Sequence, residues 1–221
     1  INCIGLLNDK AEKSPDLAIW YNSYLPNILS FYGKKNNFKL IHISTDCVFS
    51  GLKGNYKENS FKDAQGVYAQ TKSLGEVIKG NDLTLRTSIV GPELKLNGIG
   101  LFHWFMNQSG KINGYKRVFW SGITTIELSK IIHLCIQKNI RGLYQLSNNN
   151  KINKYDLLQL FNKYFKNNEL IINSDSLHIS DKSLINSRTD FDFKIPKYEK
   201  MIIEMKGWII DNKDIYRHYK F

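Results

Sequence analysis

The sequence predicts an α/β protein built around a parallel sheet. Short apolar runs at 39–44 and 83–90 have the length and composition of buried strands. Apolar residues recur at helical spacing between 17 and 29, and a second helix fits 67–79. Strands and helices therefore alternate, which is typical of the right-handed crossovers that build parallel sheets.

The first half of the chain begins with an apolar run that closes on Gly5. A helix should start at Pro15, because Ser14 is a good N-cap and Pro is favoured at the first helical position. Pro26 should kink or interrupt this helix, since it has no backbone N–H to donate. The predicted elements are strands at 1–5, 39–44 and 83–90, helices at 15–29 and 67–79, and a loop with Gly51 and Gly54.

The second half is less regular and has no internal repeat or low-complexity linker. The 221 residues fit one large domain or two small ones that share a core. The predicted elements are helices at 125–137 and 154–165, strands at 142–146 and 170–172, and a last short helix at 201–205.

Composition excludes several classes of protein. Hydrophobic residues make up 42% and charged residues 23%, which excludes collagen-like, disordered and coiled-coil chains. No stretch approaches the length of a transmembrane helix, so no membrane partner is expected. The net charge of +11 comes mainly from scattered Lys rather than Arg, which argues against nucleic-acid binding and suits a small anionic ligand.

The three cysteines, Cys3, Cys47 and Cys135, are far apart and form no C-x-x-C pattern. This arrangement argues against a disulfide scaffold and a metal site, and it favours a reducing, cytoplasmic compartment. The chain opens on Ile1 rather than Met, without the charge pattern of a signal peptide. We therefore expect a chain that is incomplete at its N-terminus.

Polar residues follow the predicted strand at 39–44. Ser44, Thr45 and Asp46 stand where the strand ends, and ligands of open α/β sheets bind at the carboxyl ends of the strands. Alternatively, the two hydroxyl groups only end the strand by bonding the loop backbone. Position alone leaves both interpretations open.

Tyr68 and Lys72 stand four residues apart on a predicted helix and therefore share one face. An ammonium beside a phenol lowers the phenol pKa from about 10, which would make Tyr68 a general acid/base. The spacing alone is a weak signal, because a chain so rich in Tyr and Lys contains such pairs by chance. Tyr216 and Lys220 form a second one in the polar tail.

The combination is more specific than its parts. The helix with Tyr68 and Lys72 follows the strand that ends at Thr45, so adjacent elements can present all three groups together. A hydroxyl that binds a carbonyl oxygen, a phenol that protonates it and a cation that tunes the phenol form a carbonyl-reduction site. These groups supply no hydride, so the site implies a nicotinamide cofactor.

Three short patterns together resemble the extended short-chain dehydrogenase/reductases: S-T-D at 44–46, Y-x-x-x-K at 68–72 and G-E at 75–76. Within them, the chain is similar to the dTDP-4-dehydrorhamnose reductase family over most of 1–205. The further segments that carry the resemblance are Asn2 to Gly5, Lys10 to Ala18 with Asn22, Ser44 to Gly51, Leu85 to Ser88, Gly122 to Thr125, Tyr144 to Ser147 and Tyr155 to Leu158.

The resemblance implies a doubly wound, Rossmann-type parallel sheet, N-terminally incomplete, with a small α/β substrate-binding domain. Residues 1–91 would be the C-terminal part of the NAD(P)-binding Rossmann domain. Residues 92–221 would form the substrate-binding region, with roughly 120–147 returning to the Rossmann domain.

The implied activity is NAD(P)H-dependent reduction of the C4 keto group of a nucleotide-linked 4-keto-6-deoxy sugar, in surface polysaccharide biosynthesis. The nucleotide sugar is the expected partner, NADP or NAD the expected cofactor, and a homodimer the candidate assembly. Related 4,6-dehydratases place Glu after T-D, where this chain has Cys47, so reduction is favoured over dehydration. The alternatives are a non-catalytic binding or regulatory relative and a nucleotide-sugar 4-epimerase, which usually has S-S rather than S-T-D.

The resemblance also assigns roles to residues. Tyr68 would protonate the C4 oxygen, Lys72 would bind nicotinamide ribose and tune Tyr68, and Thr45 would hydrogen-bond the carbonyl. The cofactor-binding residues would be Asn2, Gly5, Ser44, Tyr68, Lys72, Arg86, Thr87 and Ser88. The substrate-binding residues would be Thr45, Asp46, Cys47, Val48, Ile89, Trp104 and Trp120, and no metal is expected.

Three departures from the family pattern bear on these roles. The glycine-rich turn G-x-x-G-x-x-G is absent, so about 60 residues that would bind the pyrophosphate are expected before Ile1. Ile89 stands where the rhamnose reductases usually carry a sugar-stacking Trp, which favours a related deoxysugar. Ala69 replaces the common Gly after the catalytic Tyr.

Other residues whose side chains could catalyse or bind a ligand have simpler interpretations. His42 alternates inside an apolar strand and is interpreted as a satisfied core histidine rather than a catalyst. Four aromatic residues could line a sugar pocket by stacking or be buried in the second domain, and position does not decide between these roles. They are Trp104, Phe105, Phe119 and Trp120.

Overall fold

The computed structural model describes residues 1–219 and centres on a three-stranded parallel sheet. Its strands are β1 (Ile41–Thr45), β2 (Leu83–Thr87) and β6 (Gly142–Gln145), in the order β1-β2-β6. Every residue of the central strand β2 is buried, as expected for a strand covered on both faces.

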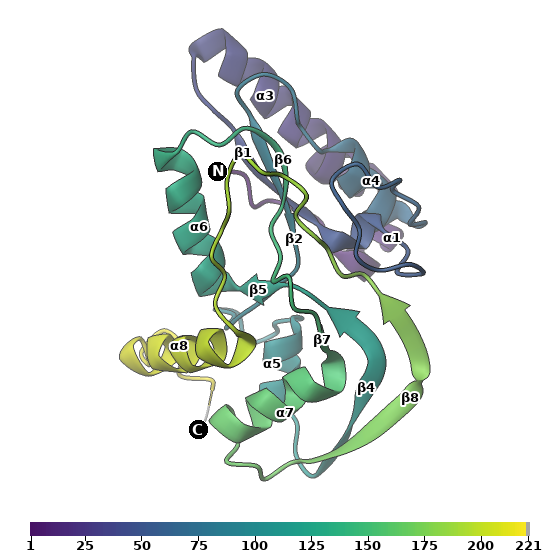
Figure 1. Cartoon of the computed structure of the whole chain (residues 1–221), viewed down its shortest axis with the longest axis vertical. Helices are drawn as coiled ribbons and strands as arrows, with labels where there is room; N and C mark the ends of the chain where they lie inside the picture. Colours follow the sequence, from purple (N-terminus) through teal and green to yellow (C-terminus); the bar gives the residue numbers. More distant parts are fainter. Residues whose placement is uncertain (220–221) are drawn as a thin grey trace.

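Helices cover both faces of this sheet, as the sequence predicts. Figure 1 shows α3 and α4 on one side of the sheet and α6 on the other. The bounds are Leu25–Asn36 for α3, Val67–Leu74 for α4 and Thr125–Gln137 for α6. Among residues 1–219, no helix is long and apolar enough to cross a membrane.

The segment before α3 is helical but not uniform. Pro15 opens α2 (Pro15–Ala18) directly after Ser14, as predicted. Residues Ile19–Tyr24 then form a π-helical stretch, and α3 follows with Pro26 in its first turn. Proline is tolerated there because no intrahelical bond needs its missing N–H, so the irregularity lies just before Pro26. A short helix that the sequence did not predict, α1 (Asn8–Lys13), precedes them.

A second sheet forms the other end of the molecule (Figure 1). Its central strand β4 (Lys111–Trp120) pairs antiparallel with β7 (Ile152–Asn153) and parallel with β8 (Ile171–Asp181). The helix α7 (Lys154–Phe165) packs on β4 and contacts both α5 and α8. The remaining bounds are Leu101–Met106 for α5, Tyr198–Asp211 for α8, Ile89–Val90 for β3 and Ile123–Thr124 for β5.

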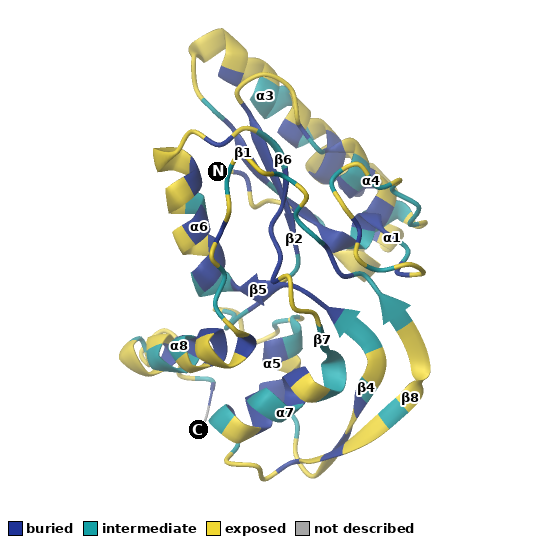
Figure 2. Cartoon of the chain, viewed as in Figure 1, coloured by how far each residue is buried: buried dark blue, intermediate teal, exposed yellow. Residues whose placement is uncertain are grey.

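One apolar core joins the two sheets. Leu83 and Leu85 of β2 belong to the same buried cluster as Phe102, Phe161 and Phe165 of the second sheet's helices. The Phe102 ring meets the other two rings edge-on, with centroids 5.4 and 4.7 Å apart, a favoured aromatic geometry. Figure 2 shows buried residues along β1, β2 and β6 and on the inward sides of α6 and α7.

Several predicted elements are wrong in extent. Residues 1–5 form no regular strand, only an isolated parallel bridge between Asn2 and His42. The helix predicted to reach 79 ends at Leu74. Gly75 follows it and packs so closely on a neighbouring backbone that a Cβ would lie 1.8 Å from Asn22 O. The strand predicted at 83–90 divides at Ser88, where β3 leaves to pair with β5.

The second sheet accounts for the other differences. The strand predicted at 170–172 extends over the whole of β8, and the helix predicted at 201–205 extends over α8. β4 and α5 were not predicted at all. Gly114 and the adjacent Lys116 and Arg117 obscure the strand pattern of β4, and β8 is largely exposed, so long-range pairing rather than local sequence defines both strands.

Candidate active site

The carboxyl ends of β1 and β2 border a cavity of about 480 Å³. Thr45, Tyr68 and Lys72 all line it, so the structure brings together the three residues that the sequence singled out. The cavity lies where ligands bind in doubly wound sheets. The other predicted site residues that line it are Gly5, Ser44, Asp46, Cys47, Thr87, Ser88 and Ile89.

Lys72 is a buried ammonium on the inward face of α4. Its Nζ donates a hydrogen bond to the Ile43 carbonyl oxygen of β1, 2.8 Å away. Burial lowers the Lys72 pKa to about 8, although the nearby Glu76 and Cys3 raise it. The hydrogen bond therefore holds the Lys72 side chain at the strand end. With a pKa of about 8, the amine loses its proton at mildly basic pH.

Thr45 caps the short 3-10 turn at Asp46–Val48. Its hydroxyl accepts a hydrogen bond from Cys47 N at 3.1 Å and donates to Asp46 Oδ1 at 3.2 Å. Burial raises the pKa of the Asp46 carboxyl and also raises that of the Cys47 thiol, to about 11. The capping interpretation is therefore confirmed for Thr45, which also lines the cavity, and the ligand-binding interpretation stays a prediction.

Tyr68 lies in the first turn of α4, one turn before Lys72. Burial raises the pKa of its phenol, the neighbouring Cys47 and Asp46 raise it further, and the Thr45 hydroxyl opposes them. The lowered Tyr68 pKa that the sequence predicts is therefore not found in this structure, because desolvation prevails over the Thr45 hydroxyl. A phenol with a raised pKa keeps its proton at neutral pH and can act as an acid.

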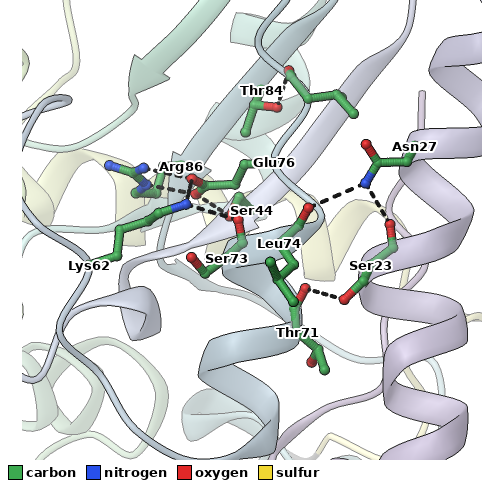
Figure 3. A network of polar contacts seen from close by, with 11 residues as sticks. Ser23, Asn27, Ser44, Lys62, Thr71, Ser73, Leu74, Glu76, Thr84 and Arg86 are labelled. Carbon is green, nitrogen blue, oxygen red and sulfur yellow. Dashed lines mark hydrogen bonds and ion pairs between the residues drawn. The ribbon is translucent and has the colours of Figure 1, made fainter.

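The π-helical stretch anchors α4 beside the cavity. Ser23 Oγ donates to Thr71 O at 2.8 Å, as Figure 3 shows, and Asn22 Nδ2 donates to Thr71 Oγ1 at 3.1 Å. The same Asn22 amide exchanges hydrogen bonds with both backbone groups of Leu6. Asn22 therefore ties the loop after Gly5 to α4, a positioning role that the sequence did not reveal.

Arg86 does not line the cavity. Figure 3 shows its guanidinium paired with Glu76, through Nε and Nη2 at 2.8 Å each. Ser44 Oγ donates to Glu76 Oε1 at 2.8 Å and Lys62 Nζ lies 3.1 Å from Oε2. Burial opposes ionisation of Glu76, but the Arg86 contacts prevail and lower the Glu76 pKa. Arg86 thus fixes the strand end through Glu76, on the side of the strand away from the cavity.

Four further predicted site residues lie outside this cavity. Asn2 bridges β1 and Val48 packs with Phe49 in a separate small core. Trp120 is buried and donates its Nε1 proton to Ser88 Oγ at 2.9 Å, so it supports a cavity residue without facing the cavity. Trp104 is 40% exposed and lines a different cavity, of about 710 Å³.

The remaining aromatic and histidine residues that the sequence singled out do not line the cavity at the strand ends. Phe105 is fully buried in the core, and Phe119 lies under Lys151 Nζ at 4.7 Å. His42 is a core residue as predicted, with Nδ1 3.1 Å from Asn2 Nδ2. Its Nε2 has no partner among the residues described, so the histidine is only half satisfied. Tyr216 is described, whereas Lys220 lies outside the described residues.

Sequence reasoning missed two lysines near the site. Lys154, the first residue of α7, and Lys182 both lower the pKa of the Asp46 carboxyl. Burial lowers the Lys154 pKa to about 8, while Asp46 and Cys47 raise it. A lysine at the start of a helix, where a cation is unfavourable, was the available signal.

The residues around Lys72 fit a nicotinamide cofactor. An ammonium has three donors and Lys72 uses one on Ile43 O, which leaves the others for ribose hydroxyl groups. Gly5 borders the same space, and a Cβ there would lie 3.9 Å from Lys72 Nζ. Ser44, Thr87 and Ser88 add polar groups around the lysine. These donors and acceptors suit the hydroxyl groups of a ribose.

The parallel sheet has helices on both faces, and the cavity at the carboxyl ends of its strands is lined by Thr45 of β1 and by Tyr68 and Lys72 of α4. This is the Rossmann-type architecture of short-chain dehydrogenase/reductase structures. The family model described as the RmlD substrate binding domain matches residues 7–178, and the chain belongs to that family. No curated protein matches the chain.

Solved structures share the fold at low sequence identity. A dTDP-4-dehydrorhamnose reductase of Clostridium acetobutylicum is 18% identical with a TM-score of 0.80, covering 95% of this chain and 80% of that one. One from Bacillus anthracis, solved with NADP, is 21% identical with a TM-score of 0.78 and coverages of 91% and 78%. A dTDP-glucose 4,6-dehydratase of Bacillus anthracis, solved with NAD, is 16% identical with a TM-score of 0.69 and coverages of 96% and 74%.

Proposed function

We propose that this protein reduces the C4 keto group of a nucleotide-linked 4-keto-6-deoxy sugar with NAD(P)H, in surface polysaccharide biosynthesis. The observation that carries the proposal is the meeting of Thr45, Tyr68 and Lys72 around one cavity at the carboxyl ends of β1 and β2. Membership of the RmlD substrate binding domain family supports the substrate class.

In this mechanism, the chain's own groups bind the carbonyl and supply a proton. The Thr45 hydroxyl donates to the C4 oxygen instead of to Asp46, an exchange that costs little because the present bond is long at 3.2 Å. Tyr68 then transfers its phenolic proton to the same oxygen as negative charge develops there. The raised pKa of Tyr68 suits this step, because the phenol holds its proton until the oxygen becomes basic.

Lys72 has two tasks in the proposal. It stabilises the Tyr68 phenolate left after proton transfer, and it binds the ribose hydroxyl groups of a nicotinamide cofactor. Gly5, Ser44, Thr87 and Ser88 would hold the same part of that cofactor. When bound, the cofactor supplies the hydride to C4. We propose a nicotinamide dinucleotide without choosing between NADP and NAD.

The substrate would span two cavities. Asp46, Cys47 and Ile89 line the first cavity around the reacting sugar. Leu101 lines both cavities, and the second one contains Trp104 with Tyr115, an aromatic surface suited to a nucleobase. Ile89 offers no aromatic face to the sugar, which supports a deoxysugar other than the substrate of the rhamnose reductases.

We also propose a division of the chain between cofactor binding and substrate binding. Residues 1–91 would belong to the cofactor-binding domain and 92–221 to the substrate-binding region. The segment 120–147 would return to the first domain, which agrees with the parallel pairing of β6 with β2.

The test is hydride transfer by the Tyr68→Phe variant of the complete protein. NADPH and NADH oxidation would be followed at saturating dTDP-4-keto-6-deoxyglucose. We expect loss of the proton donor to lower turnover at least ~100-fold. Tyr216→Phe is the matched control, since it removes the hydroxyl of the chance Y-x-x-x-K pair. Unchanged turnover in Tyr68→Phe would contradict the proposal. Nucleotide-sugar binding without hydride transfer in the wild type would instead indicate a non-catalytic relative.

A further inference from the structure

Lys154 is a half-buried cation that no residue neutralises fully. Neither a hydrogen-bond acceptor nor an ion-pair partner for its Nζ exists among residues 1–219, and its closest described contact is the Trp120 ring, 5.2 Å from Nζ to centroid. Neighbouring lysines differ in this respect. Lys151 pairs with Asp181 at 2.6 Å and Lys163 with Glu199 at 2.8 Å.

The surroundings of Lys154 do not favour a cation. It is the first residue of α7, where the helix dipole repels positive charge. The carboxyl whose charge raises the Lys154 pKa is that of Asp46, and Lys182 acts on the same carboxyl. One carboxyl cannot neutralise two ammonium groups, and burial raises the pKa of Asp46 itself. An unpaired buried charge costs stability, so an anionic ligand would offset that cost.

The position of Lys154 indicates which anion fits. It lines the second cavity together with Leu101, which also lines the catalytic cavity. Its Nζ lies 5.2 Å from the ring of Trp120, which donates to Ser88 of the catalytic cavity. It therefore lies at the junction of the two cavities. A nucleoside diphosphate sugar with its base in the second cavity and its sugar in the first has its diphosphate at this junction.

We propose that Lys154 binds the diphosphate of the nucleotide sugar and thereby positions the sugar beside Tyr68. This inference rests on the proposed function and adds a specificity-determining residue to it. Lys154 selects for substrates that carry the diphosphate over free sugars and sugar monophosphates, because an ammonium at this junction has no other acceptor in the described chain.

The test compares diphosphate binding with nucleoside binding. Lys154→Gln, Lys154→Arg and the control Lys163→Gln would be titrated calorimetrically with dTDP, UDP, thymidine and uridine. Lys163 lies on the same helix and its replacement removes the same charge at an exposed position. We expect Lys154→Gln to weaken diphosphate binding at least ~10-fold and nucleoside binding less than ~2-fold, with Arg restoring most of the affinity.

Three results with the variants would overturn the inference. They are unchanged diphosphate affinity in Lys154→Gln, an equal loss for nucleoside and diphosphate, and an equal loss in Lys163→Gln. Absence of diphosphate binding by the wild-type chain would overturn it as well. Failure of the proposed function gives a different result, since the Lys154 effect on dTDP or UDP would persist in a protein that transfers no hydride.

Discussion

Two groups of buried charges lie on either side of the strand end at Ser44 and Thr45. Behind it, Glu76 receives hydrogen bonds from Arg86, Ser44 and Lys62 (Figure 3), and its pKa is lowered. In front of it, Lys72 has one carbonyl acceptor and Lys154 has none among the described residues, and burial lowers the pKa of both to about 8.

The difference separates charges that hold the fold from charges that are available to a ligand. Glu76 and Arg86 satisfy each other, and the guanidinium also lies 5.0 Å from the Phe49 ring, so they fix the strand end. Lys72 and Lys154 have no ion-pair partner among the described residues, so the rest of the fold must offset the cost of burying them, and an anionic or polar ligand would lower that cost. Desolvation without a counter-ion therefore distinguishes the side of the strand end on which we propose the site.

The largest effect should come from breaking the pair behind the sheet. Arg86→Met leaves the buried Glu76 carboxylate with Lys62, which is partly exposed, as its remaining cation. We expect a loss of about 3–5 kcal/mol in the free energy of unfolding. The double variant Glu76→Leu with Arg86→Met removes both charges and should lose less. Denaturant unfolding measures both variants. A double variant as unstable as the single one would show that packing, not the uncompensated charge, causes the loss.

Removing the Lys72 charge should have the opposite effect on stability. Lys72→Met should abolish hydride transfer and raise the free energy of unfolding at pH 7 by about 1–2 kcal/mol, since a desolvated ammonium disappears. The folded pKa of about 8 lies below the ordinary value of 10.5, so the folded chain binds fewer protons between these values. The wild type should therefore gain stability relative to the variant as pH rises from 8 to 10.5.

Unfolding of both proteins at pH 7, 9 and 10.5 checks this prediction. Lys72→Arg is the comparison that keeps a charge, and it should show no gain at pH 7. A Lys72→Met variant that is less stable than the wild type at every pH would mean that the hydrogen bond to Ile43 O outweighs desolvation.

Elements defined by local signals were predictable from the sequence, and α6 and α7 have the predicted bounds. The side chains of Thr124 and Asn153 cap them by accepting bonds from Glu127 N and Asp156 N. β4 and β8 were not predictable in extent, because each exists by pairing with the other across a long stretch of sequence.

The same distinction applies to the site. Thr45, Tyr68 and Lys72 were found because a strand end and an i, i+4 spacing are local patterns. Their catalytic roles stay predictions. Lys154 was missed because its importance depends on Asp46, which is distant in sequence. The raised Tyr68 pKa was also missed, since desolvation depends on burial that spacing does not report.

The smallest effect should come from the exposed edge of the Glu76 cluster. The Lys62 side chain is 32% exposed and its Nζ lies 3.1 Å from Glu76 Oε2, so Lys62→Gln should cost less than about 1 kcal/mol. Salt should reduce even this loss, because exposed charges are screened and buried ones are not. Unfolding at low and high ionic strength would compare it with Arg86→Met, whose loss should not depend on salt. A salt-independent loss in Lys62→Gln equal to that of Arg86→Met would contradict this order, because it would mean that Lys62 stabilises the Glu76 charge as much as Arg86 does.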